Sequence, residues 1–518
     1  MQPKSYVVLG GGITGLSTAW HLSRLAPKAS KITLVEKTSR LGGWVHTKLQ
    51  HGQIFELGPR TLRPVGDGGR ATLEMVIVSS VHKVHQLNLQ DEVLTTAKTS
   101  PAAINRYIYK DARLHQLPTS PLELLAPWKL KSPLLKGLVF SLLKEPFVAA
   151  SKASDESVHS FVSRRFGQNV ADNLVSAVLH GIYAGNAKEL SVRSAIPLLW
   201  ELEKNHGSVG RGLLAPPDRK AVAAALKKAR EDAKTRDANA DAFVRELQST
   251  TSIYSFKDGM QTLTDALHRD LETKENVELV RGEVEQISLG PNPEVFHSGD
   301  SNPIKADHVI STLPASALHS LLPSSQQPLA SLLSTIKSVN VATVNLAFRG
   351  SASKVLSLNG FGYLIPLTEP TGVLGIVFDS CAMPEQDAPD ATRMTVMMGG
   401  HRFEQYYGNP DTVSIDTLRD AALTAARTHL GIDAELIDVN VALHRQCIPQ
   451  YTVGHHDRLQ EMHNTILRDC GGTLSLAGAS YFGVGVNDCV KGARDLVTAL
   501  LKPASADSVI TGLERVEL

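Results

Sequence analysis

The sequence predicts an α/β protein with a parallel sheet near its N-terminus and a separate mixed sheet in its second half. A strand, a glycine turn, a helix and a second strand follow one another over residues 6–36. A strand, a glycine-rich loop and a helix start occur over residues 474–489. Between these units, β-branched and apolar stretches predict the strands of the mixed sheet.

The N-terminal unit begins with an apolar run, Tyr6-Val7-Val8-Leu9, that is typical of a short buried parallel strand. Glycines follow over Gly10–Gly15, then a helical pattern over Leu16–Leu25 and a second strand over Ile32–Val35. Glu36 ends this strand, about 20 residues beyond the glycines. This order of elements is the dinucleotide-binding arrangement.

Each residue of this motif has a physical role in such a site. Gly10 permits the sharp turn, Gly12 lets a pyrophosphate approach the backbone, and Gly15 allows the helix to pack close to the strands. The helix start offers free N–H groups and a positive dipole end to phosphates. Glu36 can accept hydrogen bonds from ribose hydroxyls, which favours an unphosphorylated ribose. The plainer alternative is an ordinary glycine turn after a strand.

The residues after Glu36 favour a flavin over a nicotinamide cofactor. The string Arg40-Leu41-Gly42-Gly43-Trp44 resembles the Arg-x-Gly-Gly doublet of the superfamily of FAD-binding amine oxidases, phytoene desaturases and protoporphyrinogen oxidases. The second glycine pair would bring backbone close to the cofactor again, and Arg40 would pair with its phosphates.

Length and composition set the outer limits. At 518 residues the chain is long enough for two or three domains. Its net charge of +1 makes no case for nucleic acid or for an acidic substrate. The four cysteines lack the spacing of zinc ligands, so no metal site is expected. No apolar run reaches the ~18 uncharged residues that would span a bilayer.

Several strings in the middle of the chain resemble protoporphyrinogen oxidases more closely. Arg106 lies in a hairpin strand where the matching arginine of that family faces a substrate propionate, and the alternative is a surface ion pair. Gly181 lies where two glycines are expected to break a helix beside the substrate cavity, or in a plain helix–helix turn. Phe361 and Leu364 would sandwich a flat tetrapyrrole with Met397 packed against it, although such residues are more often plain core.

Two segments have an unusual composition. Residues 118–150 are rich in leucine, dotted with lysines and contain Trp128. Such a stretch suits a helix that lies in a membrane interface, and the alternative is a pair of core helices. Residues 206–252 become rich in alanine and in both signs of charge. This predicts a solvated helix or a partly disordered insertion without a core face.

The C-terminal unit resembles the second flavin motif of the superfamily. Its strand ends near Gly478, and Gly485 precedes the start of a helix. A positive helix end near the flavin ring would stabilise the negative charge of reduced flavin. Ala479 stands where many relatives carry an acid, which weakens a side-chain contact to the ribityl or phosphate region. Cys489 raises the amine oxidase alternative, because some of those enzymes attach flavin covalently through a cysteine near this motif.

The resemblance covers nearly the whole chain and implies a Rossmann-like FAD-binding domain, a mixed-sheet substrate domain and a helical membrane-associating subdomain. The implied boundaries are 1–92, 253–315 and 450–518 for the FAD-binding domain, 93–117 and 316–449 for the substrate-binding domain, 118–205 for the helical part and 206–252 for the charged insertion. The residues that it assigns to the cofactor are Gly10, Gly11, Gly12, Thr14, Gly15, Glu36, Lys37, Arg40, Gly43, Trp44, Gly58, Pro59, Arg60, Val284, Ala477, Gly478, Gly485, Val486 and Asn487. The residues that it assigns to the substrate are Arg106, Gly181, Phe361, Leu364 and Met397.

The implied activity is the oxygen-dependent oxidation of protoporphyrinogen IX to protoporphyrin IX, the penultimate step of heme biosynthesis. Non-covalent FAD would accept the hydride, and hydrogen peroxide would be the by-product. No histidine or carboxylate stands out as an obligatory base, which suits a reaction that depends on positioning and on the flavin. The alternatives are an FAD-dependent amine oxidase and a flavin-bound scaffold without turnover.

The resemblance also implies partners and a location. Besides protoporphyrinogen IX and dioxygen, they are a membrane surface, a second copy of the chain in a homodimer, and ferrochelatase for handover of the product. No nucleic acid is expected. The implied location is the mitochondrial inner membrane, as a peripheral protein. The first residues lack the arginine- and serine-rich composition of a transit peptide, so internal targeting is expected.

Overall fold

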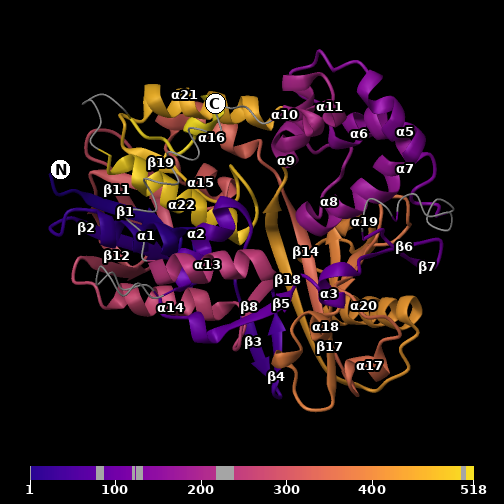
Figure 1. Ribbon diagram of the computed structural model, residues 1–518. Coiled ribbons are helices and arrows are strands. Elements are labelled where there is room, and N and C mark those ends of the chain that lie inside the picture. Colours follow the sequence, from indigo (N-terminus) through magenta and orange to yellow (C-terminus); the bar gives the residue numbers. More distant parts are fainter. Residues whose placement is uncertain are drawn as a thin grey trace.

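The chain folds into two lobes, each built around one large sheet, with a group of helices above the second lobe (Figure 1). This arrangement is seen in a computed structural model that describes residues 2–77, 87–119, 123, 132–216, 238–502 and 509–517. Both ends of the chain lie on the first lobe (Figure 1). The predicted class, α/β with one parallel and one mixed sheet, is confirmed.

The first lobe contains a parallel sheet whose strands come from distant parts of the chain. The sheet has the order β19-β13-β1-β2-β9. Its strands are β1 Ser5–Leu9, β2 Lys31–Glu36, β9 Val277–Arg281, β13 His308–Ser311 and β19 Leu474–Leu476. Val7 is paired with Thr33 on one side and with Val309 on the other, so the N-terminal strand lies at the centre.

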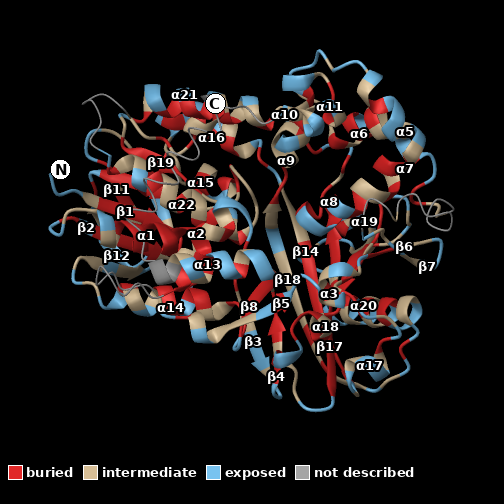
Figure 2. Cartoon of the chain, in the orientation of Figure 1, coloured by how far each residue is buried: buried red, intermediate tan, exposed pale blue. Residues whose placement is uncertain are grey.

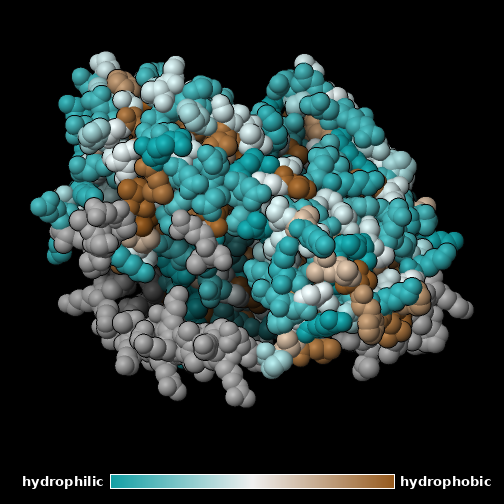
Figure 3. Space-filling model, turned by 90° about the horizontal axis from the view of Figure 1, so that it is seen from above, coloured by the Kyte–Doolittle hydropathy of each residue, from teal (hydrophilic) through white to brown (hydrophobic). Residues whose placement is uncertain are grey.

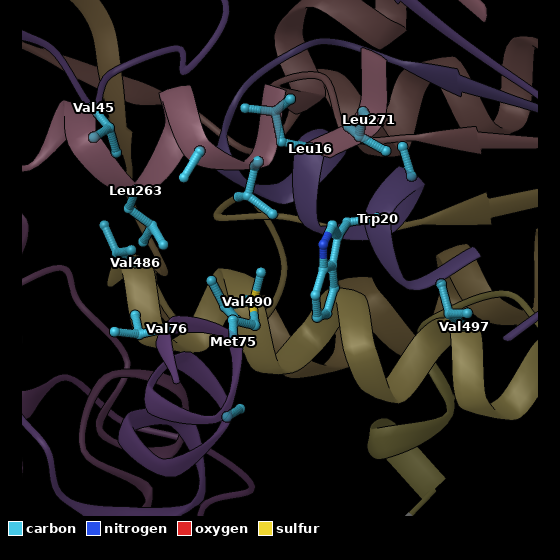
Figure 4. Packing of buried hydrophobic residues seen from close by; sticks show 14 of the residues in the cluster. Leu16, Trp20, Val45, Met75, Val76, Leu263, Leu271, Val486, Val490 and Val497 are labelled. Carbon is cyan, nitrogen blue, oxygen red and sulfur yellow. The ribbon is translucent and has the colours of Figure 1, made fainter. Parts of the chain in front are cut away.

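Both faces of this sheet are covered, which explains the continuous apolar run of β1. Val8 belongs to one core and Val7 to the other. Helices α1 Ile13–Leu25, α2 Gly66–Val76, α14 Gln261–Glu272 and α22 Val486–Leu500 contribute to the first core, and so does α13, described below. Those of the second are α15 Ala315–Leu321, α16 Gln327–Ser334 and α21 His455–Asp469. Figure 4 shows Trp20 of α1 beside α22, whose Val490 and Val497 join the same core.

Smaller sheets complete this lobe. A three-stranded sheet consists of β10 Val284–Ser288, β11 Glu294–His297 and β12 Asp300–Lys305. One hairpin consists of β3 Thr47–Gln50 and β4 Gln53–Glu56, and another antiparallel pair of β5 Val93–Ala97 and β8 Thr251–Phe256. Short helices outside the helical group described below are α3 Pro101–Ile104, α17 Ala352–Val355, α18 Asp379–Ala382, α19 Phe403–Tyr407, η1 Gln90–Glu92, η5 Ser324–Gln326, η6 Pro384–Gln386 and η7 Glu514–Glu517.

The second lobe is built on a seven-stranded mixed sheet with the order β18-β14-β17-β16-β15-β6-β7. Its strands are β6 Tyr107–Lys110, β7 Arg113–Gln116, β14 Ser338–Arg349, β15 Gly362–Leu364, β16 Val373–Val377, β17 Ala391–Gly400 and β18 Leu436–Pro449. The sequence predicts strands over residues 339–348, 360–366, 372–378 and 394–398, and β14 to β17 lie there, whereas β18 was not predicted.

Alternation along β14 gives this sheet two different faces. Val344 and Leu346 are buried in an apolar core that also contains residues of α20 Ile415–Leu430. Thr343 and Asn345 point to the opposite face and bond to the hairpin of the first lobe. The polar face is therefore where the two lobes meet, and β14 is red along most of its length in Figure 2.

The helical group consists of α5 Leu138–Lys144, η3 Glu145–Phe147, α6 Val158–Phe166, α7 Gln168–Val170, η4 Ala171–Val175, α8 Ser176–Tyr183, α9 Val192–Ala195, α10 Pro197–His206 and α11 Val209–Leu214. Its centre holds a fully buried Arg165, which is paired with Glu145 at 2.7 Å and also with Glu203. The helix break predicted over residues 179–186 is present, but Gly181 does not cause it. Helix α8 continues through Gly181 and ends at Tyr183, where Ala184 takes a left-handed conformation (φ 48°).

The predicted absence of a core face in residues 206–252 is also wrong. Helix α13, Ala238–Thr250, buries Val244 and Leu247 in the core of the first lobe. Asp241 of this helix pairs with Arg70 of α2. Two apolar residues three positions apart form a narrow stripe that composition alone conceals. Residues 217–237 lie outside the described part of the chain.

The proposed membrane segment can be assessed only in part. Trp128 and most of residues 120–131 lie outside the described residues. Leu134, Leu135 and Leu138 are buried in the core of the helical group. In the described part of the chain, no helix is long and apolar enough to cross a bilayer.

Candidate functional site

The two N-terminal glycine pairs lie against each other at the start of α1. The N–H of Gly42 donates to the carbonyl of Gly11 at 2.8 Å, and Gly12 forms a bridge with Gly42. A Cβ added to Gly43 would lie 3.0 Å from the Cα of Gly12. Only bare backbone fits here, so the two loops form a surface that a ligand can approach closely.

The C-terminal glycine loop reaches the same place. A Cβ added to Gly478 would lie 3.5 Å from Oγ1 of Thr14, and helices α1 and α22 pack side by side (Figure 4). Helix α1 begins after Gly12 and α22 after Gly485, and neither has a side-chain cap. Two helix N-termini with free N–H groups therefore lie beside bare backbone, which fits the phosphates of a dinucleotide.

Glu36 marks the nucleoside end of this surface. Its carboxylate accepts hydrogen bonds from the N–H of Gly11 at 2.7 Å and from the N–H and hydroxyl of Thr38. Its backbone carbonyl accepts from Gly282 at 3.0 Å, which brings the start of β10 and Val284 to this end. Lys37 forms an exposed ion pair with Glu283. Val284 and Glu36 are thus neighbours, as an adenosine site requires.

Arg40 braces the second glycine loop. Its guanidinium donates to the carbonyls of Leu41 and Val45 at 2.9 Å each and to that of Gly43 at 2.5 Å. Partial burial lowers the pKa of this guanidinium. These contacts fix the loop, and pairing of Arg40 with a phosphate stays a prediction.

The segment after the β3–β4 hairpin rests on the polar face of the mixed sheet. The carbonyl of Leu57 accepts from the hydroxyl of Thr343 at 2.8 Å, and Nε2 of His444 lies 2.6 Å from the same oxygen. A Cβ on Gly58 would lie 2.0 Å from the carbonyl oxygen of Trp44, so no side chain fits at this position. The ring of Trp44 meets His444 edge-on at 5.2 Å. Gly58 and Pro59 are therefore held between the two lobes.

Glu56 is a buried acid at the end of this hairpin. Its carboxyl group accepts from the N–H of Met260 at 2.6 Å and from the hydroxyl of Thr47 at 2.9 Å. Burial raises the pKa of Glu56 to about 8, because the charged form loses its hydration. This carboxyl group is therefore mainly protonated at neutral pH.

Two of the predicted substrate residues, Leu364 and Met397, lie on the mixed sheet, and a third, Gly181, lies on the helix that packs against them. Leu364 is paired with Gly375, and Gly375 with Met397, across three adjacent strands. These three paired residues, Leu364, Gly375 and Met397, form a row across the sheet. A Cβ on Gly181 would lie 2.9 Å from the side chain of Leu364, so α8 covers this row. Met397 is paired in turn with Thr343, which bonds to the hairpin. The row therefore runs from α8 to the segment that carries Gly58.

Phe361 packs in a different cluster from Leu364, and the predicted sandwich of a tetrapyrrole between the two side chains stays a prediction. Its side chain packs with Ile253, Ala382 and Met383, whereas Leu364 packs with the helical group. The backbone explains the separation, because Gly362 follows with a φ of 137° that turns the chain before β15.

Arg106 is exposed at the entrance of β6. No carboxylate within the described ranges pairs with it, so the alternative of a surface ion pair has no support there. Partial desolvation and the positive charge of Arg63 both lower the pKa of this guanidinium. An arginine with free donors suits an anionic group of a ligand.

The C-terminal motif is fixed from three sides. Asn487 accepts from the hydroxyl of Thr72 at 2.8 Å and donates to the carbonyl of Arg63 at 2.8 Å. The carbonyl of Ala479 accepts from the hydroxyl of Tyr451 at 2.5 Å. Ala477 donates to Ser311 of β13, and Val486 is buried. The roles of these residues toward a cofactor stay predictions.

Cys489 is a poor candidate for covalent attachment of flavin. It is buried between α1 and α22, and its thiol bonds to Thr14. Burial raises the pKa of this thiol to about 11, which keeps it protonated and weakly nucleophilic.

The sequence did not reveal the residues that join Arg60 to the mixed sheet. Arg60 lies 3.5 Å from Asp379, and the hydroxyl of Thr395 donates to Asp379 at 2.6 Å. Asn345 donates to both Thr395 and the carbonyl of Glu56. The available signal was the polar alternation of Thr343, Asn345 and Thr395 in otherwise apolar strands.

Comparison with known proteins agrees with this geometry. Residues 13–501 match the family described as flavin containing amine oxidoreductase. Protoporphyrinogen oxidase of Homo sapiens is 40% identical over 501 residues, which cover 96% of this chain and 98% of that protein. The protoporphyrinogen oxidase of Schizosaccharomyces pombe is 34% identical, with coverages of 94% and 96%.

Solved structures share the fold. A protoporphyrinogen oxidase-like protein of Exiguobacterium sp. 255-15 superimposes with a TM-score of 0.73 and 23% identity, over 97% of this chain and 99% of that chain. Cyclohexylamine oxidase of Brevibacterium oxydans superimposes with a TM-score of 0.60 and 14% identity, over 96% and 99%. The chain therefore belongs to the flavin containing amine oxidoreductase family and, within it, to the protoporphyrinogen oxidases.

Proposed function

We propose that the chain oxidises protoporphyrinogen IX to protoporphyrin IX in heme biosynthesis, with non-covalent FAD as hydride acceptor and dioxygen as oxidant. One observation carries the proposal. The bare-backbone surface at α1 and α22 is joined, through the segment 56–60, to an apolar row of Leu364 and Met397 on the mixed sheet. The match to curated protoporphyrinogen oxidases spans both parts.

FAD, when bound, would supply a two-electron acceptor for the hydride, and dioxygen would restore its oxidised form with release of hydrogen peroxide. Because the porphyrin has six hydrogens fewer than the porphyrinogen, this cycle would run three times for each substrate molecule and use one dioxygen each time. The residues of the chain supply position. The N-termini of α1 and α22 would hold the phosphates and the electron-rich end of the ring, and Glu36 would hold the ribose.

The substrate is a flexible macrocycle that carries two propionates. Leu364 and Met397 give its face an apolar support, and Arg106 binds a propionate through charge-assisted hydrogen bonds. A bulky, partly apolar substrate held in one orientation meets the main requirement of hydride transfer, which is a short and aligned approach. The pyrrole N–H proton passes to solvent, since no base is placed on this row.

Aerobic turnover tests the proposal. Purified protein should be yellow, and protoporphyrinogen IX mixed with it in air should give porphyrin fluorescence together with hydrogen peroxide. A flavoprotein that binds the substrate without making porphyrin would be a scaffold, and one that oxidises amines instead would be an amine oxidase. Either result would contradict the proposed reaction.

Acid precipitation tests the mode of FAD binding. Because the thiol of Cys489 is buried and bonded to Thr14, the flavin should remain in the supernatant. A yellow pellet would mean a covalent bond and would count against this part of the proposal.

We also propose that the helical group contacts a membrane, as a peripheral protein of the mitochondrial inner membrane. The exposed side chains of Phe140, Leu143 and Phe147, on α5 and η3, support this, and Phe147 is 83% exposed. Leu214, 88% exposed, lies on α11, whose N–H groups bond to Glu145 of η3. Figure 3 views the molecule from above, with a notch between two lobes and hydrophobic groups scattered over a mainly hydrophilic surface. The exposed apolar side chains of α5, η3 and α11 together form the patch that we assign to the membrane, and exposed apolar side chains suit insertion into an interface.

Flotation with vesicles that mimic the inner membrane tests the contact. Phe147→Asp and Leu214→Asp together should reduce the bound fraction several-fold. Leu49→Asp, which changes a 73% exposed leucine on the β3–β4 hairpin, is the matched control and should bind like the wild type. Equal binding of all three proteins would refute the assignment of this patch.

Family resemblance alone supports two protein partners, a second copy of the chain and ferrochelatase. Sedimentation at several concentrations tests the homodimer. The rate of metal insertion by ferrochelatase tests the handover. It should be faster when this enzyme supplies the porphyrin than when free porphyrin is added at the same concentration. A monomer at all concentrations, or equal rates, would refute the respective partner.

A further inference from the structure

Arg60 forms an ion pair that crosses from the first lobe to the second. Its Nη1 lies 3.5 Å from Oδ1 of Asp379, and the two side chains are 11% and 13% exposed. Asp379 is the first residue of α18 and follows β16 of the mixed sheet. This single long contact is the only side-chain pairing of Arg60 within the residues that the structure describes. Its other N–H donors are therefore available to a ligand.

Asp379 is itself held in place by a chain of hydrogen bonds. Its Oδ2 accepts from the hydroxyl of Thr395 at 2.6 Å. The hydroxyl of Thr395 accepts from Asn345 at 2.8 Å, and Asn345 also donates to the carbonyl of Glu56 at 3.0 Å. Glu56 lies four positions before Arg60, so the chain returns to the segment from which it began. The position of the Arg60 guanidinium thus depends on three side chains of the other lobe.

The charges around Arg60 leave Asp379 as its counter-ion. Glu56 is influenced electrostatically by both Arg60 and Asp379, but burial raises the pKa of Glu56 to about 8. Its carboxyl group is mainly neutral at pH 7. The other titratable side chain that bonds to the segment is His444, whose pKa is lowered by burial, so it too is mainly neutral. The negative charge beside Arg60 therefore comes from Asp379.

We propose that Asp379 is a positioning residue that fixes the Arg60 guanidinium and offsets its charge, and thereby lowers the reduction potential of FAD bound at the two glycine loops. The inference rests on the proposed function, because it requires FAD at the two glycine loops. Reduced flavin is richer in electrons than oxidised flavin, so a nearby positive charge favours reduction. Asp379 reduces that effect, and it does so by acting through Arg60.

The reduction potential of FAD in Asp379→Asn tests the proposal. Loss of the carboxylate leaves the charge of Arg60 without its partner, so the equilibrium should shift toward reduced flavin. The equilibrium constant for reduction of the bound flavin should rise about tenfold, which corresponds to a potential about 30 mV more positive for a two-electron couple. The control is Glu435→Gln, which removes one carboxylate from an Arg–Glu pair at the exposed rim of the same lobe. Its potential should equal that of the wild type.

Thr395→Val provides a second, gentler variant. It keeps the charge of Asp379 and nearly the shape of the side chain, but it removes the hydrogen bond that fixes the carboxylate. The potential should shift in the same direction by less than in Asp379→Asn, and the flavin absorption bands should shift as well. This variant also decides the matter if Asp379→Asn does not fold.

The outcomes separate this inference from the proposed function. An active, yellow wild type whose potential is matched by Asp379→Asn and Thr395→Val would overturn the role of Asp379 alone. A change in FAD affinity or thermal stability without a change in potential would make Asp379 structural, which also overturns it. A wild type that binds no FAD would overturn the proposed function and this inference together.

Discussion

Glu56 shows how one buried carboxyl group links stability to pH. Its pKa is raised from an ordinary value of 4.5 to about 8 by burial. Between these two values, the folded state holds a proton that the unfolded state has released. The free energy of unfolding therefore falls as pH rises from 4.5 to 8, by up to about 1.4 kcal/mol for each pH unit.

The variant Glu56→Gln should remove this pH-dependent fall in stability. Glutamine keeps the size and the acceptor oxygen for the N–H of Met260 but cannot ionise. Its melting temperature should therefore rise relative to that of the wild type as pH increases from 5 to 9. The exposed Glu285→Gln should show no such trend. Parallel curves for Glu56→Gln and the wild type would contradict the raised pKa.

Arg106→Ala should weaken substrate binding and leave FAD binding intact. Loss of a hydrogen bond to a charged group costs about 1.5–3 kcal/mol, so the KM for protoporphyrinogen should rise by roughly ten- to a hundred-fold. The Kd for FAD should not change. Arg113→Ala, an exposed arginine of the same hairpin, is the control. An unchanged KM in Arg106→Ala would remove Arg106 from the site.

At the scale of elements, the first turn of α1 tolerates no side chain at Gly15. A Cβ there would lie 1.8 Å from the carbonyl oxygen of Gly10, and backbone cannot yield as a side chain can. Gly15→Ala should therefore give protein without the absorption of bound flavin. Gly492→Ala in α22 is the control, because nothing lies within 4 Å of its added Cβ. This variant should keep its flavin and gain about 0.5–1 kcal/mol from helix propensity.

The elements that sequence predicted are those with a strong local pattern. The strands β1, β2 and β14 and the helices α1 and α22 are marked by apolar runs, glycine turns or a clear period. Strand β18 was missed because it lies at the edge of the mixed sheet and is half-exposed over much of its length. Edge strands carry a weaker apolar signal than central ones. Helix α20 was missed, and α13 was taken as solvated because its buried stripe is narrow.

At the scale of the whole molecule, the site depends on contacts that no local pattern encodes. The cofactor motifs could be found because each is a contiguous string with its own backbone requirement. The pair of Arg60 with Asp379 and the bond of Asn345 to Glu56 depend on the register of the mixed sheet and on how the lobes meet. The separation of Phe361 from Leu364 depends on one glycine with positive φ.

Buried histidines in both lobes and in the helical group should make the whole molecule sensitive to acid. Burial lowers the pKa of each to about 3 or 4 from an ordinary 6.5; four of them are buried, His21, His180, His308 and His455, and His429 is half-buried. Below pH 6.5 the unfolded chain takes up protons that the folded chain cannot, so stability falls as pH drops toward 4. The melting temperature should decline steeply over this range, by the equivalent of about 1.4 kcal/mol per pH unit for each of the four buried histidines and by less for His429, because solvent screens its charge. Replacing the exposed His51 with Gln should not alter the decline, and a flat profile between pH 6.5 and 5 would show that these histidines titrate when folded.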